Sequence, residues 1–519
     1  MKAWTRFWTL SLLLALLAVP AAQAEDIYPL KDGGKLTIWC TLPGIAANYI
    51  SNYSENIAYQ VMQDAVGVQF EFIHPASGQA TESFNLLVAS GTVPDIMVQS
   101  SYVGGEAGGV LDGIYADLTD LIPLYAPNYQ GYLDKSEEFR KLSTTPEGRI
   151  YAAYNYKDMV EPFYIRAQFR EDLLGKYGME IPVTLDEYEA YFDAVLADPD
   201  VDMAPFSLPN DGVSGAILCA WDVGIIQASN CASWYVVDGQ VRYGYYAPEF
   251  VEYLKLMSQW YAKGYISKDF MTANPTTLFQ TEKAACVVAN GYEMFPACKE
   301  LGVPITCGRY ARHAEDDLIH TLRKYWHNNG GTTYISGKAD EKTVATALRV
   351  IDYGYTEEGI LLWNFGPKGV TWDEVDENGY PLYNDFMLNN PNYPIVNAEA
   401  ILKPHGGGWS RFRFGDGICM ATNQKDPDNW AYRARWGDDE TVTTDYGIPP
   451  FTLSAEDDET IAQIMNNVDT HAKEMTLKYI TGAADFANFD AEYTKVLQSF
   501  GIDEAIAIKQ AGYDAYLAK

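Results

Sequence analysis

The main chemical signal in this sequence comes from its aromatic side chains. The chain contains 12 Trp, 38 Tyr and 21 Phe. Flat aromatic rings can pack against the apolar C–H faces of sugar rings, while Asn, Asp, Arg and Tyr hydroxyl groups can bond to the hydroxyl rim. Most aromatic residues of a protein pack in its core or interfaces. The position of each residue along the chain is therefore needed to distinguish a packing role from contact with a ligand.

Six aromatic residues are candidates for ligand contact because they lie at the ends of predicted strands or in glycine-rich loops. A core role stays open for each of them: Trp39, Tyr102, Tyr154, Tyr156, Tyr292 and Trp409. Four further positions complete the predicted ligand-binding set: Ser101, Asn155, Trp221 and Trp363. No catalytic residue and no metal ligand is predicted.

Common catalytic patterns are missing from the sequence. The six histidines form no H-E-x-x-H motif, and there is no G-x-S-x-G motif to anchor a serine nucleophile. The segment 405–409 (HGGGW) is glycine-rich but lacks the G-x-x-x-x-G-K-[ST] pattern of a phosphate-binding loop. With 70 acidic residues some carboxylates will be close by chance, so spacing cannot identify a glycosidase pair.

Two aspartate-rich segments have spacings like those of calcium loops, but neither has the full twelve-residue ligand set with its terminal Glu. They consist of Asp198, Asp200 and Asp202, and of Asp373, Asp376 and Asn378. We expect solvated turns there and no cofactor. A structural Ca²⁺ stays open as the alternative.

Residues 1–24 are predicted to be a secretory signal peptide. Lys2 and Arg6 form its positive region, an apolar run covers 10–19, and Ala22-Gln23-Ala24 fits an A-x-A cleavage site. The apolar run is too short to span a bilayer. The first cysteine is Cys40, so no lipid-anchoring cysteine stands at the cut. The sequence therefore predicts an exported protein, in a periplasm or outside the cell, without a lipid anchor.

The net charge and the cysteine content exclude several classes of partner and of site. A formal net charge of −33 argues against nucleic acid and anionic membrane surfaces as partners. The seven cysteines include no C-x-x-C pair, which removes the usual zinc and thioredoxin interpretations. Because seven is odd, at least one cysteine is unpaired or pairs between chains. The sequence leaves two states open: one or two disulfides, or seven reduced thiols.

The N-terminal third predicts a parallel sheet. Strands are expected at 36–40, at 68–73 and within the segment 90–98, with helical segments between them. This βαβαβ order is typical of a parallel, doubly wound sheet. Ligands of such sheets bind at the carboxyl ends of the strands, which here are 41–45 and 99–102.

The segment 148–192 changes its pattern midway. Alternating aromatic and apolar residues from Tyr151 to Phe169 predict extended chain. The ten residues FREDLLGKYG then predict a short helix that stops at Gly178. Thr184 is a fair N-cap for the helix that follows.

Six motifs in order resemble the large, family-1 type of extracytoplasmic solute-binding proteins of ABC importers, which serves oligosaccharide uptake. They are FREDLLGKYG with PVTLDEY, SGTVPDIMV at 90–98, DLTDLI at 117–122, the apolar strand 283–290 followed by Gly-Tyr, WNFGPKGVTW at 363–372, and the segments at the C-terminal end. The resemblance covers nearly the whole chain after residue 24. Lys368 stands where the family usually has Glu, which puts any role of that carboxylate in doubt here.

The resemblance implies an α/β, type II periplasmic-binding-protein fold. Each lobe would be a doubly wound, mostly parallel sheet, and the lobes would hinge about a central cleft. We expect one lobe from 25–157 plus 328–395 and the other from 158–327 plus 396–519. Tyr154, Asn155 and Tyr156 would then lie beside the hinge, and Tyr292 would stack on sugar.

The function implied is a binding role and not an enzymatic one. The protein would capture a carbohydrate, an oligosaccharide above all, and deliver it as a monomer to the transmembrane subunits of an ABC permease. Two alternatives stay open: a secreted glycoside-processing enzyme, and a binding protein that feeds a chemoreceptor or sensor.

Overall fold

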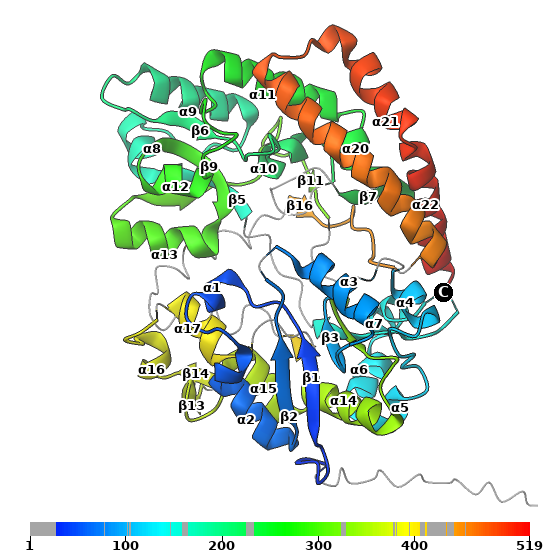
Figure 1. Ribbon diagram of the computed structural model, residues 1–519. Helices are drawn as coiled ribbons and strands as arrows, with labels where there is room; N and C mark the ends of the chain where they lie inside the picture. Colours follow the sequence, from blue (N-terminus) through cyan, green and yellow to red (C-terminus); the bar gives the residue numbers. More distant parts are fainter. Residues whose placement is uncertain are drawn as a thin grey trace, which may run out of the picture.

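The computed structural model describes residues 27–76, 78–100, 102, 105–145, 147–157, 165–224, 233–322, 328–376, 379, 381–393, 395–404, 411–412, 432, 441–451 and 453–519. The predicted signal peptide lies outside these residues. Within them, no helix has the length and apolarity needed to cross a membrane. Figure 1 shows two groups of elements, one above the other. We call them the first lobe, built on β1, and the second lobe, built on β9.

A six-stranded sheet organises the first lobe, and β1 lies parallel between β2 and β3 as the sequence predicted. On the other side of β3, β12 runs antiparallel to both β3 and β4, and β15 is parallel to β4. In spatial order the strands are β15 (Arg411–Phe412), β4 (Ala153–Lys157), β12 (Asn328–Ile335), β3 (Ile96–Val98), β1 (Lys35–Trp39) and β2 (Gln69–Ile73).

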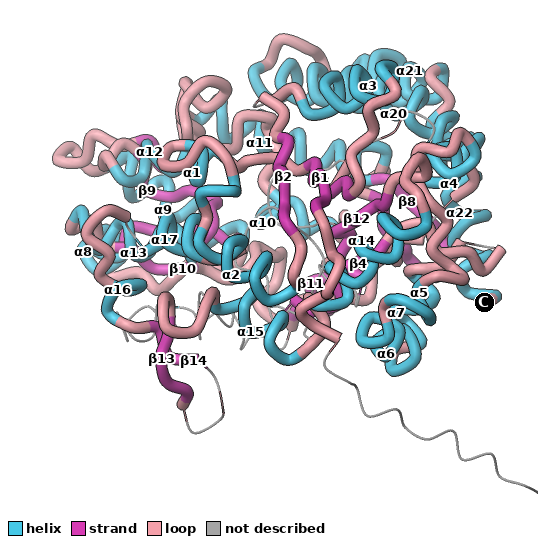
Figure 2. Tube along the Cα trace, turned by 60° about the horizontal axis from the view of Figure 1, so that its bottom comes forward, coloured by secondary structure: helices cyan, strands magenta, loops and turns pink. Residues whose placement is uncertain are grey.

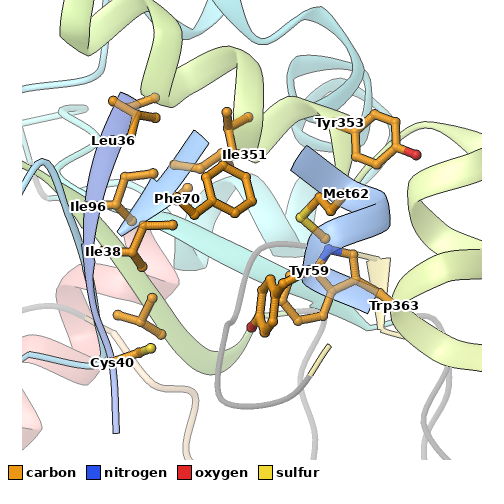
Figure 3. Close-up of a cluster of buried hydrophobic side chains, with 14 of the residues drawn as sticks. Leu36, Ile38, Cys40, Tyr59, Met62, Phe70, Ile96, Ile351, Tyr353 and Trp363 are labelled. Carbon is orange, nitrogen blue, oxygen red and sulfur yellow. The ribbon is translucent and has the colours of Figure 1, made fainter. Parts of the chain in front are cut away.

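Helices α2 (Ile57–Val66) and α14 (Glu341–Tyr353) bury apolar side chains against this sheet (Figure 3). Leu36 and Ile38 alternate with more exposed positions along β1, as expected for a strand. They share the first hydrophobic core with Met62 of α2 and Ile351 of α14. This core fixes the strand ends from which the site residues emerge.

The other helices of the first lobe complete its surface. They are α1 (Gly44–Ala47), η1 (Tyr53–Glu55), α3 (Ala80–Ser90), α4 (Gly105–Leu111), α5 (Ile122–Tyr125), α6 (Pro127–Lys135), α7 (Glu137–Leu142), α15 (Glu357–Phe365), α16 (Asp385–Leu388) and α17 (Ile395–Leu402). A hairpin of β13 (Trp372–Val375) and β14 (Pro381–Tyr383) stands out from this lobe in Figure 2.

A four-stranded sheet organises the second lobe. Strand β9 is parallel to β6, while β5 runs antiparallel to β9 and β10. In spatial order the strands are β10 (Ile305–Cys307), β5 (Ile165–Arg170), β9 (Ala284–Asn290) and β6 (Ala204–Ser207). The apolar run predicted as a buried strand at 283–290 is β9, whose first six residues are buried.

Helices cover both faces of this second sheet. The larger core contains α9 (Leu185–Ala197), α11 (Phe250–Lys263) and α20 (Ala455–Thr481), while α12 (Pro275–Gln280) and α13 (Gly291–Leu301) enclose a smaller one. The remaining elements are α8 (Glu171–Tyr177), α10 (Gly215–Leu218), η2 (Cys219–Trp221), η3 (Gly244–Tyr246), η4 (Phe486–Asn488), η5 (Asp490–Thr494), α21 (Lys495–Ser499), α22 (Ile502–Ala518) and the hairpin β7 (Trp234–Val237) with β8 (Gln240–Tyr243).

The helix signals of the segment 169–192 are confirmed. Helix α8 ends at Gly178, whose φ of 64° is a left-handed conformation that glycine adopts without a Cβ clash. Thr184 caps α9: its hydroxyl accepts from the Glu187 backbone N–H, and the Glu187 carboxylate accepts from the Thr184 backbone N–H.

The chain passes between the lobes more than once. It leaves the first sheet after β4 and enters the second at β5, then returns to the first sheet at β12. Strand β11 (Ile319–His320), just before that return, pairs with β16 (Val442–Thr443). Beyond the boundary expected at residue 395, α17 still packs in the first core and β15 still pairs with β4, so both lie with the first lobe.

Candidate functional site

A pocket of about 360 Å³ lies between the two lobes. The first lobe lines it with Tyr102, Glu106, Tyr154 and Tyr334 among others, and the second lobe with Phe451 and Asp458. We call this the interlobe pocket. Aromatic residues form the largest group in its lining, and its polar groups include two carboxylates, one from each lobe.

The sheet of the first lobe positions the tyrosines. Tyr154 of β4 is registered with Thr332 of β12, and Tyr334 follows two residues later on the same strand. Because side chains two residues apart project from the same face of a strand, Tyr154 and Tyr334 emerge together. Tyr102 lies beyond the end of β3, and the first turn of α4 carries Glu106.

Glu106 joins the two tyrosines. The Tyr334 hydroxyl donates to its Oε1 over 2.7 Å, and the Tyr154 hydroxyl donates to its Oε2 over 2.9 Å. Desolvation by burial raises the pKa of Glu106; the two tyrosine hydrogen bonds oppose this rise, and the charge of Asp458 adds to it. A carboxylate has about four acceptor positions, so Glu106 retains acceptor capacity.

The second lobe closes the pocket with the start of α20. Ser454 caps this helix by accepting from the Asp457 backbone N–H over 3.1 Å, which places Asp458 in the first turn. Burial raises the pKa of Asp458, and the nearby Lys509 of α22 opposes the rise. Lys509 itself lies over the Phe451 ring, with its Nζ 5.6 Å from the ring centroid.

Of the predicted ligand residues, the interlobe pocket contains Tyr102 and Tyr154. Three others lie in the first hydrophobic core. Tyr156 is buried with its ring centroid 4.8 Å from that of Tyr132, Trp39 is buried 5.9 Å from Phe84, and Trp363 is buried 6.2 Å from Tyr59.

The remaining predicted residues are spread over both lobes. Trp221 is half-buried in the second lobe, where its ring is 5.1 Å from that of His313. Asn155 is half-buried on β4, and its Oδ1 atom is buried with no hydrogen-bond partner among the described residues. Tyr292 belongs to the first turn of α13, and the structure does not describe its side chain. Ser101 and Trp409 lie outside the described residues.

Most residues that line the interlobe pocket were not predicted, among them Glu106, Tyr334, Phe451 and Asp458. A signal existed for Glu106, which stands in a glycine-rich stretch after the third predicted strand. Tyr334 alternates with Thr333 at a strand end, a weaker signal. Phe451 and Asp458 follow the lining residues of the first lobe by more than a hundred positions, and no local pattern connects them to the pocket.

The aspartate-rich loop at 198–202 does not fit a calcium site. Asp198 lies 2.5 Å from the Lys176 Nζ, and Asp202 lies 2.9 Å from the Lys283 Nζ. These cations occupy the carboxylates that would have to bind the ion. In the part of the chain that the structure describes, no three His, Cys, Asp or Glu side chains form a group that could hold a metal ion. Asn378 of the second aspartate-rich segment lies outside that part.

The Glu106→Gln variant is expected to gain stability relative to the wild type as the pH rises from about 4.5. The folded-state pKa of Glu106 is raised, so its contribution to folding is fully present below the unfolded pKa and is lost as the pH rises through the folded pKa. Gln does not ionise, so the difference in the free energy of unfolding between the variant and the wild type should move in favour of the variant as Glu106 ionises. Urea denaturation at a series of pH values measures the free energy of unfolding of both proteins.

The matched control is Glu456→Gln, an exposed residue in the first turn of α20. Its stability difference from the wild type should change less with pH than that of Glu106→Gln. Parallel curves for the two variants would show that the pocket does not desolvate Glu106.

No protein-family model matches the sequence. Among proteins with known roles, the chain is 23% identical over 508 residues to "Fructooligosaccharide ABC transporter substrate-binding protein FusA" of Streptococcus pneumoniae, covering 90% of this chain and 88% of that protein. It is 24% identical over 431 residues to a "Carbohydrate ABC transporter substrate-binding protein" of the same organism, covering 79% of each.

Solved structures share the fold over nearly the full length. The alginate-binding protein AlgQ2, in a crystal structure without calcium ion, matches with a TM-score of 0.76 at 20% identity, covering 94% of this chain and all of that one. S. pneumoniae FusA in complex with kestose matches with a TM-score of 0.73 at 18% identity, covering 93% and 99%. A FusA EF-hand mutant matches equally well.

These relatives are binding proteins and not enzymes, and the two-lobe fold expected from the sequence is confirmed. The sequence matches to both relatives extend over most of the chain, which supports the resemblance inferred from the order of the six motifs. In sequence, the chain is similar over most of its length to substrate-binding proteins of ABC transporters, and it shares their two-lobe fold.

Proposed function

We propose that the protein captures an oligosaccharide in the interlobe pocket, outside the cytoplasm, and delivers it to the transmembrane subunits of an ABC importer. The observation that carries this proposal is the pocket itself. It lies between two lobes and combines tyrosine rings with a carboxylate that still has acceptor positions. The carbohydrate named for both sequence relatives supports the same ligand class.

The pocket has the chemistry that a sugar requires. The rings of Tyr102, Tyr154 and Phe451 offer apolar surfaces to the C–H faces of a pyranose or furanose. Glu106 can accept a hydrogen bond from a sugar hydroxyl, and such a charge-assisted bond is stronger than one between neutral groups. We propose that Ser101, Asn155, Trp221, Tyr292 and Trp409 extend this site along a longer ligand.

Delivery would follow closure of the lobes about the segments that join them. A ligand that contacts both lobes stabilises the closed arrangement, which a membrane partner can recognise. The pattern of residues 1–24 supports export, and the negative charge of the chain supports a small-molecule ligand over a nucleic acid. The monomer is the expected state. Calcium enters this proposal only as the alternative at the second aspartate-rich segment, because the 198–202 loop does not fit an ion.

A ligand screen tests the proposal. The mature chain is heated with kestose, nystose, maltotriose, cellotriose and mannotriose, with a tripeptide pool as the contrasting ligand class. A ligand of the native state raises the melting temperature. We expect at least one oligosaccharide to do so and to bind with one-to-one stoichiometry in calorimetry. Stabilisation by the peptides alone would overturn the ligand class.

The same sample separates binding from turnover. After prolonged incubation, chromatography should recover the bound oligosaccharide unchanged, as expected for a transport protein. Accumulation of shorter sugars would favour a glycoside-processing enzyme. Supply to a sensor would be favoured if deleting the gene abolished chemotaxis towards the sugar and left its uptake unchanged.

Tyr292→Ala is expected to weaken binding of the stabilising oligosaccharide about tenfold or more, since one aromatic stacking contact contributes on the order of 1 kcal/mol beyond its area. The melting temperature of the ligand-free protein should change little, because a residue that faces an open cleft is solvated. Calorimetry and thermal unfolding measure the two quantities. A large fall in melting temperature with unchanged affinity would assign Tyr292 to the core.

A further inference from the structure

The interlobe pocket presents two acidic side chains to its occupant, one from each lobe. Glu106 comes from α4 of the first lobe and Asp458 from α20 of the second. The two helices meet here: a Cβ built on Gly105 would lie 3.5 Å from Asp458 Oδ2. The two carboxylates are therefore neighbours across the boundary between the lobes.

The lining of the pocket does not neutralise these carboxylates. The partners of Glu106 are two uncharged tyrosine hydroxyls. The charge of Lys509 opposes the raised pKa of Asp458, but Lys509 is not among the residues that line the pocket. Among the described residues, no Lys, Arg or His lines the pocket and no ion pair within 4.0 Å joins either carboxylate.

From this geometry we infer that the site selects uncharged sugar units and rejects uronic acids. The inference rests on the proposed function and narrows its substrate class. A neutral sugar offers hydroxyl donors to the carboxylates. A uronate would bring a third negative charge into a pocket that is partly shielded from water, where like charges repel strongly.

This selection does not follow from the fold. The two-lobe architecture can hold either kind of ligand, since the charge of the site depends on the residues that reach into the pocket. Here those residues include Glu106 and Asp458, and each is half-buried. Rejection of the wrong ligand by an unfavourable charge contact is a recognised source of specificity.

The test compares neutral and acidic ligands with matched backbones. Calorimetry at pH 7 and low salt measures binding of cellotriose and cellotriuronate, mannotriose and trimannuronate, with kestose as a further neutral trisaccharide. The tightest neutral trisaccharide should bind at least about a hundredfold more tightly than either uronate, because like-charge contacts in an interface are strongly unfavourable.

Variants then assign the effect to the two carboxylates. In Glu106→Gln/Asp458→Asn the preference for neutral over acidic trisaccharides should fall at least about tenfold, through a gain in uronate affinity. The control Glu456→Gln/Glu459→Gln removes the same charge from exposed positions of α20 and should leave the preference unchanged. If the double variant does not fold, Asp458→Asn alone should show a smaller fall of the same sign.

The outcomes distinguish the inference from the function on which it rests. A wild-type protein that binds a uronate within tenfold of the best neutral trisaccharide contradicts the inference and leaves oligosaccharide capture intact. An unchanged preference in the carboxylate variants contradicts it as well. Failure of every sugar to bind would overturn the proposed function, and the inference with it.

Discussion

Replacing Trp260 with alanine is expected to lower the free energy of unfolding by about 3–5 kcal/mol. Trp260 is completely buried at the centre of the second core. Its ring is 5.2 Å from that of Phe192 and nearly perpendicular to it, and 6.2 Å from that of Phe206. Its Nε1–H donates to Glu189 Oε1 over 2.8 Å. Truncation removes the packing of α11 against α9 and leaves a large cavity.

Urea denaturation followed by circular dichroism measures this loss. Trp234→Ala is the matched control, because Trp234 is only half-buried on the hairpin strand β7 and should cost much less. Should the lobes unfold in separate steps, only the transition of the second lobe should move for either variant. Equal effects of the two substitutions would contradict the central role of Trp260.

Asp352→Ala is expected to cost about 3 kcal/mol, since buried donors that lose their acceptor carry the full penalty of desolvation. The Asp352 side chain is fully buried on α14. It accepts from the Tyr129 backbone N–H over 2.9 Å and from Asn128 Nδ2 over 2.7 Å, and the Tyr28 hydroxyl lies 3.4 Å away. These bonds tie the N-terminal segment and α6 to α14.

Two further variants test the explanation. Burial raises the pKa of Asp352, so its charged form is unfavourable, and Asp352→Asn should cost less than Asp352→Ala. Asp340→Ala removes the N-cap of the same helix, where the carboxylate accepts from the Thr343 backbone N–H, and should cost about 1 kcal/mol. If Asp340→Ala proved the more damaging variant, the buried bonds of Asp352 would not be the main support of α14.

Local signals in the sequence predicted most of the elements. Alternation of apolar residues identified β1 and β2, and an unbroken apolar run identified β9. Capping chemistry marked the end of α8 at Gly178 and the start of α9 at Thr184. Each of these signals lies within a few residues of the element it defines, which is why one sequence sufficed.

Pairing between distant strands could not be predicted in the same way. Nothing within Ile165–Arg170 specifies that β5 runs antiparallel to both β9 and β10, because that direction depends on segments more than a hundred residues away. The two residues of β15 are too few for a pattern, yet their pairing with β4 keeps the chain in the first lobe past the expected boundary.

The residues of the candidate site also differ in whether a local signal could identify them. Tyr102 and Tyr154 could be predicted because each stands at or near a strand end in the first lobe. Trp39, Tyr156 and Trp363 were predicted as well, but their rings pack in the first core. Tyr156 follows Tyr154 by two residues on the same strand, so its position along the strand could not tell whether its ring reaches the pocket. Phe451 and Asp458 reach the pocket only through tertiary packing.

Helix α20 gives the second lobe a long rigid arm. It runs from Ala455 to Thr481 with one end at the interlobe pocket, and it packs along α11 in the second core. At 1.5 Å per residue its 27 residues span about 40 Å. A rotation that brings Asp458 a small distance towards a ligand would therefore displace the distant end of the helix by several times as much. A spin label near Thr481, paired with one in the first lobe, would report occupancy of the pocket from far outside it.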